Sequence, residues 1–210
     1  MNPRRRLPTV VAALLLAIAV PLPGEAGAAP RGAEARSANR TATRPAHWAA
    51  KLDKPGLLNF HQVTTNLYRG GQPTAEGMAQ LKAMGIKTVI NLRSSHSDLD
   101  KLLGTGMKNG QLHMNPWRAE QDEVARFLKT VADTNNLPAF VHCQRGADRT
   151  GMMCAVYRVV VCGWTKPEAI REMTQGGFSF NPMWKNLVRY IERMDVAALQ
   201  RQAGVKLAQP

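Results

Sequence analysis

The chain has 210 residues, a hydrophobic fraction of 44% and a formal net charge of +13. This length suits one domain with extensions, and the apolar content supports a modest globular core. The positive charge favours phosphorylated, anionic or membrane-surface partners, although an Ala/Arg-rich coding habit of the source would produce the same excess. Nucleic acid is disfavoured as a partner, because no run of aromatic residues is interleaved with the basic ones.

The first 28 residues have the pattern of a signal peptide. Arg4, Arg5 and Arg6 precede a short apolar run over 10–20, and the small residues at 26–28 predict cleavage after Ala28. The run is shorter than the ~20 residues that span a bilayer, so an uncleaved membrane anchor is the second interpretation. We therefore expect export to a periplasm or beyond, with peripheral contact to an anionic membrane as a further expectation.

Residues 29–54 are rich in Ala, Arg and Pro and contain almost no large apolar residue except Trp48. Such a segment buries too little surface to offset its ordering entropy, so we expect a disordered linker. The predicted organisation is a signal peptide (1–28), this linker (29–54), a folded domain (55–200) and a flexible tail (201–210).

Strand-like and helix-like segments alternate in the folded part. The helix between Thr74 and Gly85 begins at a candidate N-cap and ends at a glycine. The segment 120–133 has a clear apolar stripe at helical spacing. The expected strands cover 60–63, 66–68, 86–92, 112–114 and 138–141, and the other expected helices cover 99–103, 150–161, 166–173 and 184–199. This order predicts an α/β fold with a central, mostly parallel sheet flanked by helices and a site at the carboxyl end of a strand.

The most informative stretch is 141–151, where an apolar strand, a glycine-containing loop and a helix N-terminus follow one another. Backbone N–H groups and the positive end of the helix dipole then face the same place, which makes an anion site. Cys143 opens the loop and Arg149 closes it. A thiol in that field ionises more easily than a free cysteine, and a guanidinium offers a planar fork of donors to a phosphate. This arrangement indicates phosphoryl transfer through a cysteinyl-phosphate.

These residues resemble the signature His-Cys-x5-Arg-Thr/Ser-Gly of the cysteine-dependent protein tyrosine and dual-specificity phosphatases. Every fixed position is filled, from His142 to Gly151, with Gly146 at the internal glycine. The segments 67–73 and 85–93 look like the small dual-specificity phosphatases, particularly exported bacterial members. The resemblance covers about 58–195 and implies a dual-specificity phosphatase fold that uses neither metal nor cofactor.

The resemblance also assigns roles. Cys143 is the expected nucleophile, and Arg149 with the N–H groups of the loop is expected to stabilise the phosphoryl oxygens. Thr150 is expected to donate its hydroxyl to the sulfur, and His142 to orient the loop through backbone hydrogen bonds. The expected substrate-binding residues are Gln144, Arg145, Gly146, Ala147 and Thr150. The side chain of Arg145 is expected to point outward, either toward a second phosphate or simply into solvent.

The general acid is less well defined by the sequence. An ester oxygen needs a proton when it leaves, and Asp or Glu is the usual donor. Asp148, within the signature itself, resembles the in-loop aspartate of myotubularin-like lipid phosphatases and some secreted bacterial phosphatases, and we favour it. Asp122 and Glu120 are the alternatives, although both also suit the first turn of the following helix.

The remaining cysteines and histidines suggest structural roles. Cys154 and Cys162 would lie about 12 Å apart on one helix, too far for a disulfide. A reversible bridge between Cys143 and Cys154 is a weaker idea, and oxidation of Cys143 alone is favoured over it. The histidines have no spacing typical of metal ligands, so we expect no metal.

We therefore expect a monomeric phosphatase that acts on phosphomonoesters, with phosphotyrosine, phosphoserine or phosphothreonine in proteins as the default substrates. Phosphoinositides or inositol polyphosphates are the first alternative. A catalytically silent phosphate-binding module is an alternative of another class, and a sulfurtransferase or arsenate-reductase-like thiol enzyme is a third. The loops 94–98, 115–119 and 176–183 should set the depth of the pocket and so decide the substrate.

Overall fold

The computed structural model describes residues 44–205, which belong to one compact unit. The strands are β1 (Ala50–Lys51), β2 (His61–Thr64), β3 (Leu67–Gly70), β4 (Thr88–Asn91), β5 (Lys108–Gln111) and β6 (Ala139–His142). The helices are α1 (Ala75–Ala83), α2 (Leu99–Leu102), α3 (Gln121–Ala132), α4 (Asp148–Val160), α5 (Lys166–Gln175), α6 (Lys185–Arg193) and α7 (Val196–Ala203), with a 3-10 turn η1 at Thr134–Asn136. The predicted α/β class with a mostly parallel sheet is confirmed.

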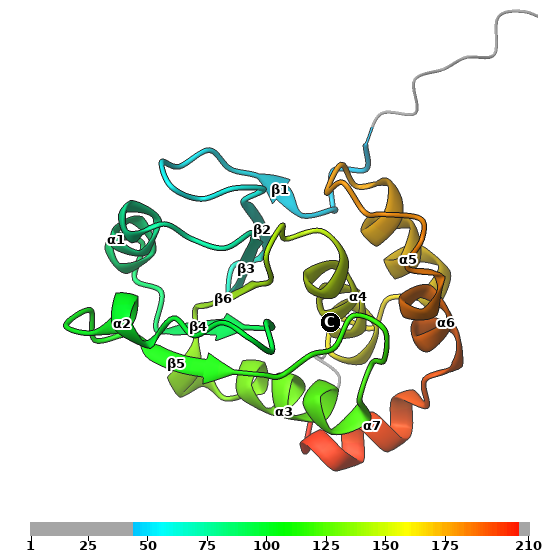
Figure 1. Ribbon diagram of the computed structural model, residues 1–210. Coiled ribbons are helices and arrows are strands. Elements are labelled where there is room, and N and C mark those ends of the chain that lie inside the picture. The colour runs from blue at the N-terminus through cyan, green and yellow to red at the C-terminus, as the bar shows by residue number, and fades with distance from the viewer. Residues whose placement is uncertain (1–43, 206–210) are drawn as a thin grey trace, which may run out of the picture. The chain divides into compact units, whose positions relative to one another are not determined.

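The six strands form one sheet in the order β1-β2-β3-β6-β4-β5 (Figure 1). β6 lies between β3 and β4 and pairs with both in parallel, and β5 adds to β4 in parallel. β1 and β2 extend the other edge in antiparallel pairing, so the hairpin expected over 60–68 is confirmed as β2 and β3. The carboxyl ends of β3, β4 and β6 therefore meet at one edge of the sheet, where ligands bind in open α/β folds.

Both faces of β4 and β6 are buried, which suits the adjacent apolar residues at the centre of each strand, Val89-Ile90 and Phe140-Val141. Along β6, Phe140 faces a smaller core with α1 and α2, whereas Ala139 and Val141 face a larger core with α3 to α7. α4 runs through the middle of this larger core, and every residue from Thr150 to Val160 is buried. The figure shows α1 and α2 on one side of the sheet and α4 on the other (Figure 1).

Two predicted elements differ from the structure. The strand expected over 112–114 is wrong, because the edge strand β5 lies earlier, at Lys108–Gln111. β5 consists of polar residues and a glycine, so a search for apolar residues does not find it. Its backbone hydrogen bonds to β4 define it as a strand. Leu112 and Met114 are buried because the following loop covers the core.

The single helix expected over 184–199 is two helices. Met194 has an extended backbone, with φ −57° and ψ 138°, which ends α6. The side chain of Asp195 then accepts a hydrogen bond from the N–H of Ala198 and caps α7. α7 continues to Ala203 and Val205 is buried, so the predicted flexible tail begins too early.

The predicted linker ends earlier than expected. Trp48 and Ala49 are buried, and the N–H of Ala49 donates to the carboxylate of Glu172 in α5 at 2.6 Å. Residues 44–54 therefore pack on the domain, because one aromatic residue and one buried acceptor hold them there. The predicted signal peptide and the rest of the linker, 1–43, lie outside the described residues. Within 44–205, no helix combines the length and the apolar character that crossing a membrane requires.

Candidate active site

The site is the loop between β6 and α4. β6 ends at His142, Cys143 follows with 3% of its surface exposed, and α4 begins at Asp148, two residues earlier than expected. Gly146 has a φ of +70°, and a Cβ at this position would lie 2.3 Å from the carbonyl carbon of Gly70. Both the backbone conformation and the close approach of β3 therefore require glycine at this position.

Buried Arg69 holds the loop from behind. Its guanidinium donates to the carbonyl oxygens of Gly146 at 2.7 Å and Ala147 at 3.5 Å, and it stacks on the ring of Phe178 at 3.7 Å. The N–H of Gln72 donates to the carbonyl of Gln144 at 3.1 Å. Arg69 and Gln72 both belong to the 67–73 segment that carries part of the family resemblance.

Asn59 completes the set by donating from Nδ2 to the carbonyl of Arg145 at 3.1 Å. The carbonyls of all four residues from Gln144 to Ala147 thus accept hydrogen bonds from the surrounding scaffold. A loop whose carbonyls are held on one side can present its N–H groups on the other, which preorganises it for an anion.

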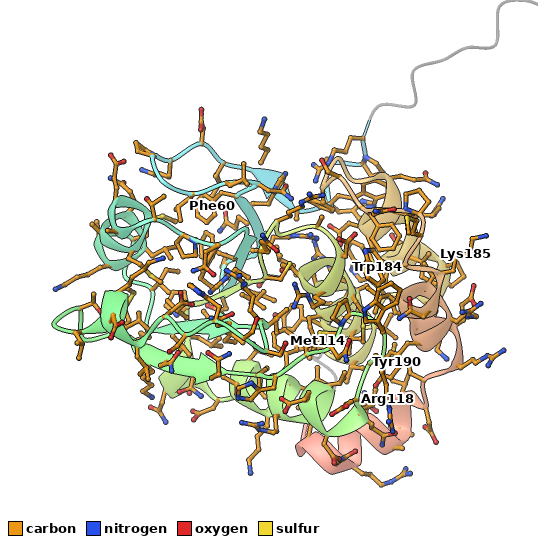
Figure 2. The ribbon with its side chains drawn as sticks, viewed as in Figure 1. Phe60, Met114, Arg118, Trp184, Lys185 and Tyr190 are labelled. Carbon is orange, nitrogen blue, oxygen red and sulfur yellow. The ribbon has the colours of Figure 1, made fainter. Side chains whose placement is uncertain are left out.

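A cavity of about 220 Å³ opens above this loop. Its walls are Pro116, Cys143, Gln144, Arg145, Asp148, Arg149, Asn181 and Trp184. Pro116 and Asn181 come from two of the loops expected to set the pocket depth, and Trp184 stands at the start of α6 (Figure 2). Residues 94–98 do not line it.

Arg149 and Asp148 are both positioned by backbone groups. Nη1 of Arg149 donates to the carbonyls of Leu92 and Met114, each at 3.4 Å. The Oδ1 atom of Asp148 accepts from the N–H of Asn181 at 2.8 Å. Of the three candidate acids, the structure brings Asp148 alone to the cavity that contains Cys143.

The two alternative acids lie elsewhere. Asp122 accepts a hydrogen bond from Gln202 in α7 at 2.9 Å and lines a separate hollow with Arg126 and Lys129. Glu120 is the exposed residue that precedes α3 and does not line the cavity.

The hydroxyl of Thr150 is fully buried in the first turn of α4, and its Oγ1 has no hydrogen-bond partner within the described chain. A buried hydroxyl without a partner is costly. Gln144 and Arg145, in contrast, are exposed at the rim of the cavity, as was expected for the side chain of Arg145.

His142 is held on both sides. Its Nδ1 lies 3.2 Å from the carbonyl oxygen of Cys143, and its Nε2 lies 2.7 Å from Oδ2 of Asp98. Asp98 is fully buried and also accepts from Nε2 of Gln72 at 2.6 Å. Burial alone would raise the pKa of Asp98, but the hydrogen bonds and charges of His142, Gln72 and His96 outweigh it, so the pKa lies below its usual value.

Asp98 and Asn59 are supporting residues that the sequence analysis missed. Asp98 lies in the 94–98 loop, which was expected to shape the pocket, but its contact with His142 supports the catalytic loop instead. No local pattern marks Asp98, because its partner His142 is 44 residues away.

The cysteines are all free. Cys154 is buried in α4, and desolvation raises the pKa of its thiol to about 11, which makes it unreactive. No group of three or more His, Cys, Asp and Glu side chains in the described part of the chain is arranged to hold a metal ion.

Comparison with known proteins assigns the family. Residues 58–185 match the family model described as "DSP-PTPase phosphatase fused to NAD+ Kinase". The chain belongs to the dual-specificity phosphatases of the cysteine-dependent superfamily. It is therefore a cysteine-dependent phosphatase.

Individual relatives agree with this assignment. The dual specificity protein phosphatase TpbA of Pseudomonas aeruginosa is 31% identical over 80% of this chain and 77% of its own. The TpbA crystal structure superimposes with a TM-score of 0.68 over 77% of this chain and 99% of that chain. The inositol diphosphatase DSP3 of Arabidopsis thaliana is 26% identical over 68% of this chain and 73% of its own. The catalytic core of SIW14 from S. cerevisiae, at 23% identity and a TM-score of 0.64, shares the fold and covers 72% of this chain and 94% of that chain.

Proposed function

We propose that this phosphatase acts on phosphotyrosine in proteins, with Cys143 as nucleophile, Arg149 as phosphate ligand and Asp148 as general acid. The observation that carries the proposal is that these three side chains line one small cavity above a preorganised loop. Trp184 and Pro116 add flat, partly apolar walls that suit an aryl ring. TpbA, which shares this fold, has been solved in complex with phosphotyrosine.

In the first step, the sulfur of Cys143 attacks phosphorus in line with the ester oxygen. The S–P bond forms, the P–O bond breaks, and Asp148 gives its proton to the leaving oxygen. Arg149 and the N–H groups of Gln144 to Arg149 stabilise the equatorial oxygens throughout.

In the second step, water attacks phosphorus and passes a proton to Asp148. The S–P bond breaks, which releases inorganic phosphate and restores the thiolate. The hydroxyl of Thr150, buried beside the loop without another partner, is assigned to the departing sulfur. Buried His142 supports the loop through its contact with the carbonyl of Cys143.

The test is turnover of aryl phosphates under reducing conditions by the wild type, Cys143→Ser, Asp148→Asn and Asp122→Asn. Cys143→Ser should be inactive. Asp148→Asn should lose about 100-fold in kcat on esters with poor leaving groups and far less on good ones, because only poor leaving groups need the proton. Asp122→Asn is the matched control and should behave like the wild type. Activity that survives in Cys143→Ser, or a larger loss in Asp122→Asn than in Asp148→Asn, would contradict the assignment.

Inositol polyphosphates are the second candidate substrates. Exposed Arg145 at the rim could meet a second phosphate, and DSP3 is an inositol diphosphatase. A panel of phosphotyrosine, phosphoserine and phosphothreonine peptides beside inositol phosphates and pyrophosphates separates the two. The highest kcat/KM on phosphotyrosine peptides supports the first proposal, and the highest on inositol pyrophosphates supports the second.

We also propose that the enzyme is exported, on the strength of the charged and apolar pattern of residues 1–28. We propose separately that it acts as a monomer, as expected from the sequence. Cell fractionation should place the activity outside the cytoplasm, with a mature chain that starts at Ala29. Recovery of full-length chain in the cytoplasm would contradict export. Size-exclusion chromatography tests the monomer, and sedimentation with anionic vesicles tests membrane contact.

A further inference from the structure

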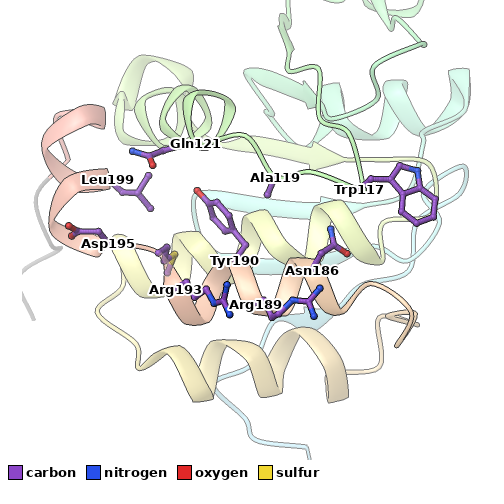
Figure 3. Close-up of a pocket in the computed structure, with 10 residues that line it drawn as sticks. Trp117, Ala119, Gln121, Asn186, Arg189, Tyr190, Arg193, Asp195 and Leu199 are labelled. Atoms are coloured by element: carbon purple, nitrogen blue, oxygen red, sulfur yellow. The ribbon is translucent and has the colours of Figure 1, made fainter.

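A second hollow lies beside the active site and takes no part in the chemistry proposed above. Its volume is about 510 Å³, more than twice that of the catalytic cavity. It is bounded by the 117–121 segment on one side and by α6 and the start of α7 on the other (Figure 3). We call this hollow the α6 groove. Figure 3 shows Trp117 at one end, Asp195 and Leu199 at the other, and Tyr190 between them.

The α6 groove adjoins the catalytic cavity, although the two share no lining residue. The ring of Trp117 packs edge-on against the ring of Trp184, with centroids 4.6 Å apart, and Trp184 lines the catalytic cavity. Nδ2 of Asn186, in the groove, donates to the carbonyl of Pro116, in the cavity wall, at 2.9 Å. The 115–119 loop is thereby fixed against α6, and the tryptophan pair lies between the cavity and the groove. A ligand long enough to reach over this pair would contact both.

The groove carries two unneutralised cations. Arg189 and Arg193 are exposed on α6 and line it. Neither guanidinium has an ion-pair or hydrogen-bond partner among residues 44–205. Asp195 is the acidic residue of the groove, but its Oδ1 already caps α7. An anionic ligand would therefore gain two charge-assisted hydrogen bonds.

The spacing of the cations matches an extended polypeptide. Arg189 and Arg193 are four residues apart on one helix, which is about 6 Å along its axis. Arg189 is about 7.5 Å beyond Trp184 by the same measure. Side chains on one face of an extended peptide recur every two residues, about 6.6–6.8 Å. Acidic side chains two and four residues from the phosphorylated one would meet Arg189 and Arg193 in turn.

The apolar walls also favour a polypeptide. Trp117 is 70% exposed, and the half-buried ring of Tyr190 adds further apolar surface beside the arginines. Desolvation raises the pKa of Tyr190 to about 12, so its hydroxyl stays protonated and can donate. Peptide side chains can cover this apolar surface, whereas a cyclitol phosphate has no counterpart for it.

We infer that the α6 groove docks the polypeptide next to the phosphorylated residue and selects acidic residues at the second and fourth positions from it. This inference rests on the proposed function, because it supposes a protein substrate. It makes Arg189 and Arg193 residues that determine specificity, while the chemistry stays with Cys143, Arg149 and Asp148.

The experiment compares three phosphotyrosine peptides that differ at the second and fourth positions on either side of the phosphotyrosine. The first peptide has Glu at the two N-terminal positions and the second has Glu at the two C-terminal positions. The third has Ala at all four. The enzymes are the wild type, Arg189→Ala, Arg193→Ala, the double variant and Lys185→Ala. Lys185 is the matched control, since it carries the same charge on the same helix but lies outside the groove and points away from the domain (Figure 2). Each kcat/KM is divided by that of the same enzyme on an aryl phosphate.

We expect the wild type to prefer one of the two Glu peptides over the Ala peptide by about tenfold, through KM. In each single arginine variant the ratio of kcat/KM for the Glu peptide to that for the Ala peptide should fall about threefold, and in the double variant the preference should disappear. A loss of this size is typical of exposed ion pairs. The preference should also shrink as salt screens the charges. Lys185→Ala should keep it.

Two different failures can be told apart. Peptides hydrolysed by the wild type without an acidic preference, or a preference that survives in the double variant, would overturn the docking inference and leave the proposed function standing. Hydrolysis of aryl phosphate but of no phosphopeptide would overturn the proposed protein substrate and the docking inference together.

Discussion

Asp98 and His142 form a buried hydrogen-bonded pair directly behind the nucleophile. Nε2 of His142 lies 2.7 Å from Oδ2 of Asp98, and Nδ1 lies 3.2 Å from the carbonyl oxygen of Cys143. Hydrogen bonds that involve a carboxylate are stronger than those between neutral groups. Asp98 therefore fixes the orientation of the His142 ring, and through the ring it positions the backbone at Cys143.

The variant Asp98→Asn tests this positioning role. Without the carboxylate, the ring of His142 loses its charge-assisted partner, and the carbonyl of Cys143 is held less firmly. We expect kcat/KM on an aryl phosphate, measured per folded enzyme, to fall chiefly through kcat, because the nucleophile is less well positioned. Asp100→Asn, an exposed acid in α2, is the control. An unchanged kcat per folded enzyme, with only a smaller folded fraction, would mean that Asp98 acts on folding alone.

The same pair makes stability depend on pH. The folded-state pKa of Asp98 lies below its ordinary value of 3.8, so its contribution is present above pH ~4 and is lost as pH falls through the lowered pKa. Urea unfolding should show Asp98→Asn about 1.5–3 kcal/mol less stable at pH 7. The difference should shrink below pH 4. A constant difference down to pH 2 would argue against an ionised Asp98.

Gly146 combines a positive φ with a close approach, and Gly146→Ala should break both. The left-handed backbone costs an alanine about 1–2 kcal/mol, and its Cβ would collide with the backbone of Gly70 at 2.3 Å. We expect kcat/KM to fall by about 100-fold as the loop shifts. Gly104→Ala is the control, because Gly104 has a φ of +71° with nothing within 4 Å of the added Cβ. Equal effects of the two substitutions would mean that strain alone, and not the contact with β3, decides the loss.

At the scale of elements, the sequence predicted what is local. The strand, the loop and α4 follow one another within 139–160, and their order alone places an N–H-rich turn at a helix N-terminus. The apolar face of α3 and the N-cap of α1 by Thr74 also depend only on residues close in sequence, and both predictions are confirmed. Each depends on residues within a few positions of one another, where period and capping chemistry decide the structure.

What the sequence left open depends on distant partners. The donors that hold the loop, Arg69 and Asn59, act across 77 and 86 residues. The break between α6 and α7 depends partly on Lys166, whose ammonium donates to the carbonyls of Glu192 and Met194. These contacts exist only once the chain has folded, so neither helical periodicity nor the signature reveals them. The edge strand β5 was missed for the same reason, because its pairing and not its side chains defines it.

At the scale of the molecule, strand β6, which leads into the catalytic loop, joins the two cores. β6 contributes Phe140 to the smaller core and Val141 to the larger one, and it delivers Cys143 at the edge where β3 and β4 also end. Supports for the loop come from both neighbouring strands: Arg69 from β3, and the carbonyl of Leu92, just after β4, which accepts from Arg149. Damage to the packing of either core should therefore reach the active site.

Glu172 tests how the segment before β1 contributes to the whole domain. Its carboxylate receives two hydrogen bonds from Arg158 at 2.9 Å and one from the N–H of Ala49 at 2.6 Å, with both side chains almost fully buried. Glu172→Gln keeps the volume but leaves the cation of Arg158 without a counter-charge. We expect a loss of roughly 3–5 kcal/mol in the free energy of urea unfolding and faster proteolysis near Trp48.

The control is Glu168→Gln on the same helix. The carboxylate of Glu168 lies 2.9 Å from Nε2 of His47, and the side chain of His47 is largely exposed. This change should cost less than about 1 kcal/mol. If the two substitutions cost the same, the Arg158–Glu172 pair is effectively solvated, and apolar burial of Trp48 and Ala49 is what joins residues 44–54 to the domain. If Glu172→Gln costs several kcal/mol while Glu168→Gln costs little, the buried pair connects α4, α5 and this segment, and the folded unit must be expressed from residue 44 or earlier to be stable.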